Sequence, residues 1–194
     1  AILDCFNRAA IKVCEGQQLD MDFENRENVS LNEYIQMIEY KTAVLLAASL
    51  QIGAITAGGS KEDQDNLYSF GINIGIAFQL KDDFLDVFGA PESFGKQIGG
   101  DISANKKTFL YLKALQLADE KTRKKLQSYY ASYNKSTKKV DEVKAIFQSL
   151  DIQKVLIDTM QTYYKKAMRH LNSINSDCKA PLITFSDKLM NRIS

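Results

Sequence analysis

Phe78-Gln79-Leu80-Lys81-Asp82-Asp83-Phe84-Leu85-Asp86 is the most informative stretch of the chain, because it sets three carboxylates on a predicted helix. Asp82 and Asp86 are four residues apart and share one helix face, with Asp83 one step round and Gln79 one turn earlier. Carboxylates this close raise one another's pKa unless a cation lies among them. Oxygen ligands suit Mg²⁺, which also binds phosphates, so the pattern is typical of a magnesium site on a helix.

The alternative is that these aspartates simply face solvent. The residues around them are apolar and indicate a partly buried segment instead: Phe78, Leu80, Phe84, Leu85, Val87 and Phe88. A metal site of the ferritin type is disfavoured, because it needs a Glu-x-x-His pattern. The only histidine, His170, lies in a different predicted helix.

Two long helices dominate the first half of the chain. One is predicted from Leu31 to about Ala57 behind a capping box of Ser30 and Glu33, and the next from Lys61 to about Phe88 behind Ser60. Each carries internal glycines, which cost helix stability and therefore indicate either close packing or room for a ligand.

The remaining segments are predicted to be shorter. Residues 1–15 read as a helix that Gly16 and the polar run 20–28 interrupt, and residues 90–107 as a loop of the length typical of lids and binding loops. Further helices are expected at about 108–118, 120–133, 139–149 and 151–175, and a last one with Pro181 in its first turn. Two prolines in 194 residues and this pattern predict an all-α helical bundle.

Composition narrows the function classes. The net charge of +1 provides no field that would attract nucleic acid or a membrane surface. Three cysteines, an odd number without metal-type spacing, fit a reducing, cytoplasmic compartment. The apolar run Thr42–Gly59 is broken by polar residues and reads as a buried helix, so no membrane span is expected.

Four segments together resemble the polyprenyl synthetase family, the trans-isoprenyl diphosphate synthases such as farnesyl and geranylgeranyl diphosphate synthase. They are similar, in order, to the family's GQxxD segment, KT pair, FQxxDDxxD motif and GK…GD…K loop. In this chain they are Gly16-Gln17-Gln18-Leu19-Asp20, Lys41-Thr42, Phe78 to Asp86, and Gly95-Lys96 with Gly100-Asp101 and Asn105-Lys106. The resemblance covers residues 1–194 and implies one domain with a helical bundle of the isoprenoid synthase type.

The resemblance also implies a reaction and a set of roles. In this family an allylic diphosphate held by Mg²⁺ ionises, and isopentenyl diphosphate attacks the resulting cation to give a product five carbons longer. By this likeness Asp82, Asp83 and Asp86 bind a metal, and Lys41, Lys96 and Lys106 contact the allylic diphosphate. Thr42 and Gln79 lie beside the cation, with Lys41 completing the catalytic set, and Gln17 and Asp20 shape the pocket floor.

Each role has an ordinary structural alternative. Lys41 could be a lysine whose stem lies along apolar surface, and Lys96 and Lys106 could be plain loop charges. Thr42 and Gln79 could bond neighbouring backbone, while Gln17 and Asp20 could be a helix-end cap and a turn residue.

One family feature is not found in the sequence. The family's first aspartate motif precedes its GQxxD segment, and only fifteen residues precede Gly16 here. We therefore expect the C-terminal part of a synthase, incomplete at its N-terminal end, with little or no activity alone and a homodimeric state at full length. A non-catalytic regulatory subunit and an unrelated helical metal-binding protein are the alternatives. The length of the product cannot be read from these residues.

Overall fold

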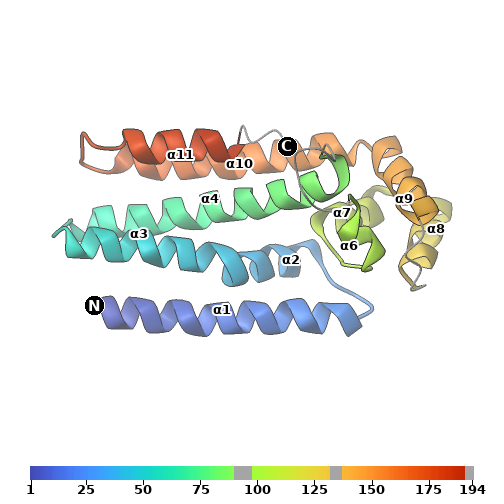
Figure 1. The fold of residues 1–194 in the computed structure, drawn as a ribbon, viewed down its shortest axis with the longest axis horizontal. Helices are drawn as coiled ribbons and strands as arrows, with labels where there is room; N and C mark the ends of the chain where they lie inside the picture. Colours follow the sequence, from blue (N-terminus) through green and yellow to red (C-terminus); the bar gives the residue numbers. More distant parts are fainter. Residues whose placement is uncertain (90–97, 132–136, 191–194) are drawn as a thin grey trace. The chain divides into compact units, whose positions relative to one another are not determined.

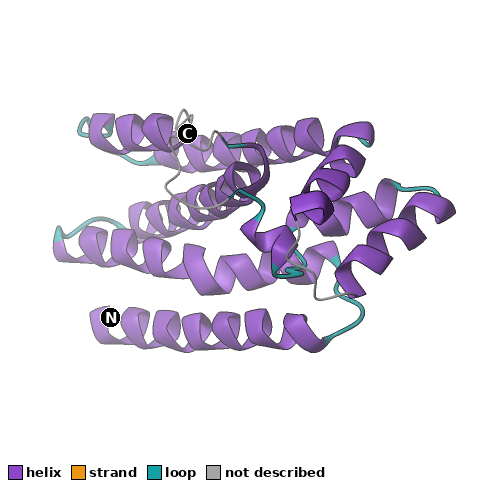
Figure 2. Ribbon diagram, turned by 45° about the vertical axis from the view of Figure 1, so that its right-hand side comes forward, coloured by secondary structure: helices purple, strands orange, loops and turns teal. Residues whose placement is uncertain are grey.

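The computed structural model describes residues 1–89, 98–131 and 137–190, and within these ranges every regular element is a helix (Figure 2). The predicted all-α class is therefore confirmed. The helices are α1 (Ile2–Asn25), α2 (Leu31–Ile38), the π-helical turn η1 (Glu39–Ala43), α3 (Val44–Thr56), α4 (Lys61–Phe88), α6 (Gly100–Ser103), α7 (Phe109–Leu117), α8 (Glu120–Ala131), α9 (Thr137–Ser149), α10 (Ile152–Ser173) and α11 (Ala180–Met190).

These residues form two compact units. The first unit comprises residues 1–21, 35–79 and the described part of 159–192, and the second comprises 22–34 and the described part of 80–158. The long helix α4 contributes to both units. A single domain over the whole chain stays a prediction.

The two predicted long helices are confirmed together with their start signals. Ser30 and Glu33 form a reciprocal capping box: the backbone nitrogen of Ser30 donates to Glu33 at 2.8 Å, and that of Glu33 donates to the Ser30 hydroxyl at 3.2 Å. At the start of α4 the backbone nitrogen of Asp63 donates to the Ser60 hydroxyl at 3.0 Å. The first of these helices contains the π-helical turn η1, which the sequence analysis did not predict.

The predicted end of the first helix near Gly16 is wrong, because α1 continues to Asn25. Gly16 is buried in the middle of the helix, where a Cβ atom would lie only 2.3 Å from the backbone nitrogen of Lys41. The glycine is therefore needed for close approach of two backbones and does not end a helix. Gln17 and Asp20 accordingly lie inside α1, and neither is a helix-end cap or a turn residue.

The first unit has two apolar clusters between its helices. Side chains from α3, α4, α10 and α11 form one, centred on the buried residues Phe70, Ile74, Ala167 and Leu171. The second joins α1 to α3 through Cys5, Ala9, Val44 and Ala48. In Figure 1, α3 and α4 run alongside each other, as do α10 and α11.

Glycines in α4 allow this packing. A Cβ atom on Gly71 would lie 2.4 Å from the Cα of Ala47, and one on Gly75 would lie 2.6 Å from the Cα of Ala43. Of the two explanations for the internal glycines, close helix packing is correct for these two positions.

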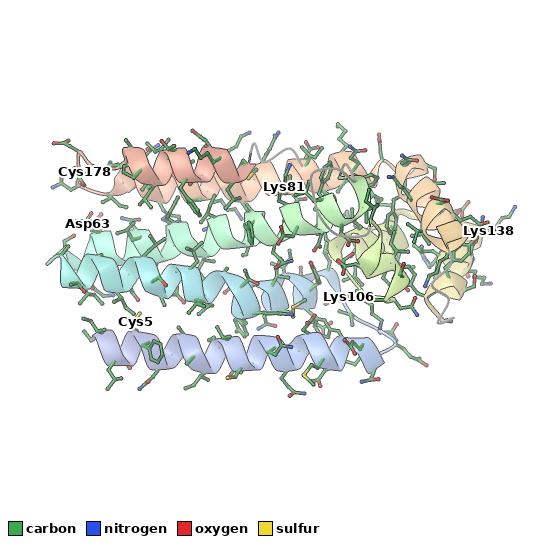
Figure 3. All side chains as sticks on the ribbon, in the orientation of Figure 1. Cys5, Asp63, Lys81, Lys106, Lys138 and Cys178 are labelled. Atoms are coloured by element: carbon green, nitrogen blue, oxygen red, sulfur yellow. The ribbon has the colours of Figure 1, made fainter. Side chains whose placement is uncertain are left out.

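At the far end of the unit, Asp63 accepts a 2.9 Å bond from the backbone of Asn175, near Cys178 (Figure 3). All three cysteines are free.

The second unit is built from shorter helices. Helices α6, α7 and α8 all contact α9, and α7 also contacts α8. The predicted loop 90–107 is partly helical, since α6 forms within it, and residues 90–97 lie outside the described residues. Gly99 adopts a left-handed conformation with φ of 74° immediately before α6.

The segment Leu31–Thr56 is long and apolar enough to cross a membrane by length and composition alone. Buried helices of globular proteins pass the same test. In this segment Ala43 and Ala47 are buried against α4 and Ala48 against α1, and 39% of its most apolar window is buried.

Candidate functional site

In the first unit, Lys41 pairs with Asp20. The Lys41 ammonium lies 2.5 Å from Oδ2 of Asp20, which places the last residue of the GQxxD segment beside the KT pair. Lys41 belongs to η1, and π-helical turns occur frequently at functional sites. Both side chains keep partial access to solvent, and the Lys41 ammonium has a carboxylate partner there.

Thr42 and Gln79 are also brought together. The Thr42 hydroxyl donates to Oε1 of Gln79 at 3.2 Å, between η1 and α4. The two residues are 37 positions apart in the sequence and bond each other. The alternative, in which each bonds only neighbouring backbone, does not describe them. Gln17, the remaining predicted residue of this unit, is exposed on α1.

In the second unit, Asp83 faces the interior. Its side chain is only 3% exposed, and its Oδ2 accepts a 2.5 Å bond from the Tyr34 hydroxyl and a 3.3 Å bond from the backbone nitrogen of Phe109. Phe109 begins α7, whose N-cap residue Thr108 supplies no side-chain bond. Asp83 therefore performs the capping role at this helix start, where a negative charge is favourable.

Asp86 lies beside the start of α6. Its Oδ2 accepts a 3.1 Å bond from the backbone nitrogen of Asp101, and its backbone carbonyl accepts a 2.7 Å bond from Gly99. Burial and the negative charge of Asp101 raise the pKa of Asp86 to about 6. Two carboxylates held this close in a half-buried position fit a site that gains a cation.

Lys106 joins the same group through an ion pair with Asp101 at 3.2 Å, so it is not an isolated loop charge (Figure 3 labels Lys106). The neighbouring Lys107 donates to the carbonyl oxygens of Phe23 at 2.7 Å and Glu24 at 3.4 Å. These carbonyls belong to the last turn of α1, where a cation is favourable. Residues 101–107 are thereby bonded to Asp86 of α4 at one end and to the last turn of α1 at the other.

The three predicted metal ligands differ in burial, since Asp83 is buried and the other two are not. Asp82 is half-buried, as is Asp86, while Asp83 bonds Tyr34 and Phe109. Among the described residues no three His, Cys, Asp or Glu side chains gather closely enough to hold a metal ion. Lys96, the third predicted diphosphate contact, lies outside the described residues.

Two residues that contact the predicted aspartates, Tyr34 and Asp101, were not predicted to do so from the sequence. Tyr34 is 49 residues before Asp83, and no local pattern links them. Asp101 belongs to the GK…GD…K loop and was given no role of its own, although it approaches Asp86 in space. Its position after two glycines in the polar loop was the available signal.

The sequence and fold of this chain are similar to those of known proteins. The family model described as Polyprenyl synthetase matches residues 1–150. This chain belongs to the polyprenyl synthetase family. The family resemblance stated from the motifs is confirmed.

Relatives within the polyprenyl synthetase family are synthases by name. A short chain isoprenyl diphosphate synthase of Methanothermobacter thermautotrophicus is 38% identical over 185 residues, which are 95% of this chain and 56% of that protein. A crystal structure of a geranylgeranyl pyrophosphate synthase is 43% identical with a TM-score of 0.90, and the match covers all of this chain and 61% of the other.

A second structure was solved with ligands. A geranylgeranyl pyrophosphate synthase from Corynebacterium glutamicum, complexed with isoprenyl diphosphate and magnesium, is 28% identical with a TM-score of 0.89. The match covers 98% of this chain and 55% of that one. The chain spans about half the length of two curated relatives, the M. thermautotrophicus synthase and a geranylgeranyl diphosphate synthase of Sulfolobus acidocaldarius.

Proposed function

We propose that this chain supplies the diphosphate-binding part of a prenyltransferase that condenses isopentenyl diphosphate with an allylic diphosphate. The observation that carries the proposal is the group formed by Asp86, Asp101 and Lys106 in the second unit. It combines carboxylates, which attract a hard cation, with a lysine, which attracts phosphate. The magnesium and isoprenyl diphosphate of the C. glutamicum relative support the same ligands here.

Magnesium fits the residues of the second unit. The donors are carboxylate oxygens, which Mg²⁺ prefers, and burial together with the charge of Asp101 raises the pKa of Asp86, an effect that a bound cation would oppose. Asp82 and Asp86 are the ligands that we favour, with Asp83 holding their helix in place. When bound, Mg²⁺ neutralises charge on the diphosphate leaving group.

The lysines complete that task. Lys106 supplies positive charge to balance the negative charge that develops as the allylic C–O bond breaks and its electron pair leaves with the diphosphate. The family resemblance implies the same task for Lys41 and Lys96. The double bond of isopentenyl diphosphate then supplies two electrons to the allylic cation, and loss of a proton restores a double bond. Thr42 and Gln79 present oxygen atoms that stabilise the cation, and Asp20 holds Lys41 in position. Gln17 keeps its proposed role in the pocket floor.

Several finer expectations belong to this proposal. The 194 residues alone are expected to form little product, because they contain one aspartate-rich motif. A homodimer at full length, a cytoplasmic location and no binding of nucleic acid stay predictions. The relatives are named as synthases, which does not favour the non-catalytic subunit.

Charge-removing variants test the diphosphate contacts. Lys41→Met and Lys106→Met should each weaken magnesium-dependent binding of geranyl diphosphate by about tenfold or more, since each removes a charge-assisted contact. Lys113→Met is the matched control, because Lys113 is a half-buried lysine of α7 that donates to Gln116 and lies outside the proposed site. Equal affinity in all three variants and the parent chain would show that neither proposed lysine contacts the ligand.

A further inference from the structure

Asp83 joins three helices at one buried point. Its Oδ2 accepts from the Tyr34 hydroxyl of α2 at 2.5 Å and from the backbone nitrogen of Phe109 at the start of α7 at 3.3 Å, while Asp83 itself belongs to α4. Tyr34 and Asp83 are each 3% exposed. A hydrogen bond between a hydroxyl and a carboxylate is short and about twice as strong as one between neutral groups.

This anchor sets the rotation of the last turns of α4. Each residue of an α-helix advances about 100° round the axis, so Asp82 lies about 100° from Asp83 on one side and Asp86 about 60° away on the same side. The direction of the Asp83 side chain therefore fixes where the other two carboxylates face. Asp86 in turn meets the backbone of Asp101.

Position matters more for a metal ligand than for an ordinary surface carboxylate. Groups that orient metal ligands through hydrogen bonds change metal affinity by about 10- to 100-fold when they are removed. Tyr34 holds Asp83, and Asp83 is one residue from Asp82 and three from Asp86. The Tyr34 hydroxyl can thus influence the aspartate motif without touching a ligand.

We infer that Tyr34 is a positioning residue for the second aspartate motif, and that it acts through Asp83 as an anchor rather than through a metal ligand. This inference rests on the proposed function. It differs from the expectation drawn from the family resemblance, which gives Asp83 the same role as Asp82 and Asp86.

The chain offers a matched control. Tyr129 on α8 donates its hydroxyl to the carboxylate of Glu142 on α9, which is the same kind of bond in the same unit but outside the aspartate motif. Tyr34→Phe and Tyr129→Phe each remove one oxygen atom and one such bond. A purely structural role for Tyr34 predicts similar effects of both changes on ligand binding.

The test is calorimetric titration of inorganic diphosphate into the 194-residue chain in saturating Mg²⁺, with folding checked by circular dichroism. Tyr34→Phe should weaken binding about tenfold or more. Tyr129→Phe should stay within about twofold of the parent chain. If the parent chain binds and both variants bind equally well, this inference is overturned while the proposed function stands. If the parent chain shows no magnesium-dependent binding, the proposed function fails, and the inference fails with it.

A double-mutant cycle tests the route through Asp83. In an Asp83→Asn background the Tyr34→Phe change should cause little further loss, because the anchor that Tyr34 acts on is already altered. Losses that multiply independently would show that Tyr34 acts by another route and would overturn the inference.

Discussion

Gly16 of α1 and Lys41 of η1 lie in backbone contact, since a Cβ atom on Gly16 would be 2.3 Å from the Lys41 nitrogen and 2.8 Å from its Cα. Neither neighbour is a flexible side-chain end that could move aside. Gly16→Ala should therefore destabilise the chain by about 1–3 kcal/mol, despite the better helix propensity of alanine. Chemical denaturation measures this change, and weaker magnesium-dependent binding of diphosphate should accompany it.

Gly53→Ala provides the opposite case in the same unit. A Cβ atom there has nothing within 4 Å, so alanine should stabilise α3 by about 0.5–1 kcal/mol. If the two alanine variants were equally stable, the close contact of Gly16 with Lys41 would not exist in solution.

Asp86 should give the stability of the chain a distinctive pH dependence. Its folded-state pKa of about 6 is above the ordinary value of 3.8, so the folded state binds more protons between these values. Its contribution to stability is full below pH 4 and is lost as the pH rises through 6. Asp86→Asn should remove this loss and stabilise the chain at pH 7 by on the order of 1 kcal/mol, after allowance for solvent screening.

Asp119 serves as a control for the direction of that effect. Its bond from the backbone nitrogen of Thr122 lowers the pKa of Asp119, so its contribution is present above the ordinary pKa and lost as the pH falls. Denaturation curves of Asp86→Asn and Asp119→Asn across pH 3–8 should thus deviate from the parent chain in opposite directions. Deviations of the same sign would contradict the assigned environment of Asp86.

Lys107 should matter for stability more than an ordinary loop lysine. Its ammonium bonds two carbonyls of the last turn of α1, and burial lowers its pKa. Lys107→Met should cost about 1–2 kcal/mol, because those carbonyls lose a charged donor. Thermal unfolding compares it with Lys113→Met, for which a change within about 0.5 kcal/mol is expected. If the Lys107 variant were as stable as the Lys113 variant, the bonds from Lys107 to the end of α1 would not contribute to stability.

The sequence predicted the helices well where local signals were sufficient. Ser30, Glu33 and Ser60 determine helix starts by bonds to nearby backbone, so their pattern could be recognised directly. Gly16 was wrongly predicted to end a helix, because this position needs glycine for its close contact with residues 40 and 41, which are distant in sequence. Local chemistry cannot distinguish a glycine that ends a helix from one that permits packing.

In the candidate site, too, features set by local sequence could be predicted and contacts between distant residues could not. The spacing of Asp82 and Asp86 follows from helix geometry, and the motif order identified the family correctly. The partners of Asp83 could not be predicted, since Tyr34 and Phe109 reach it only through the tertiary fold. The role of Asp101 beside Asp86 is likewise a product of the folded loop.

The central claim is that the second aspartate motif forms a working diphosphate site with Mg²⁺. Calorimetric titration of geranyl diphosphate into the chain, with and without Mg²⁺, tests it most directly when an Asp82→Ala/Asp86→Ala variant is measured in parallel. The account predicts binding that requires Mg²⁺ and is lost in the variant. Binding of equal strength without Mg²⁺ or in the variant, or no binding to the parent chain under any condition, would contradict it.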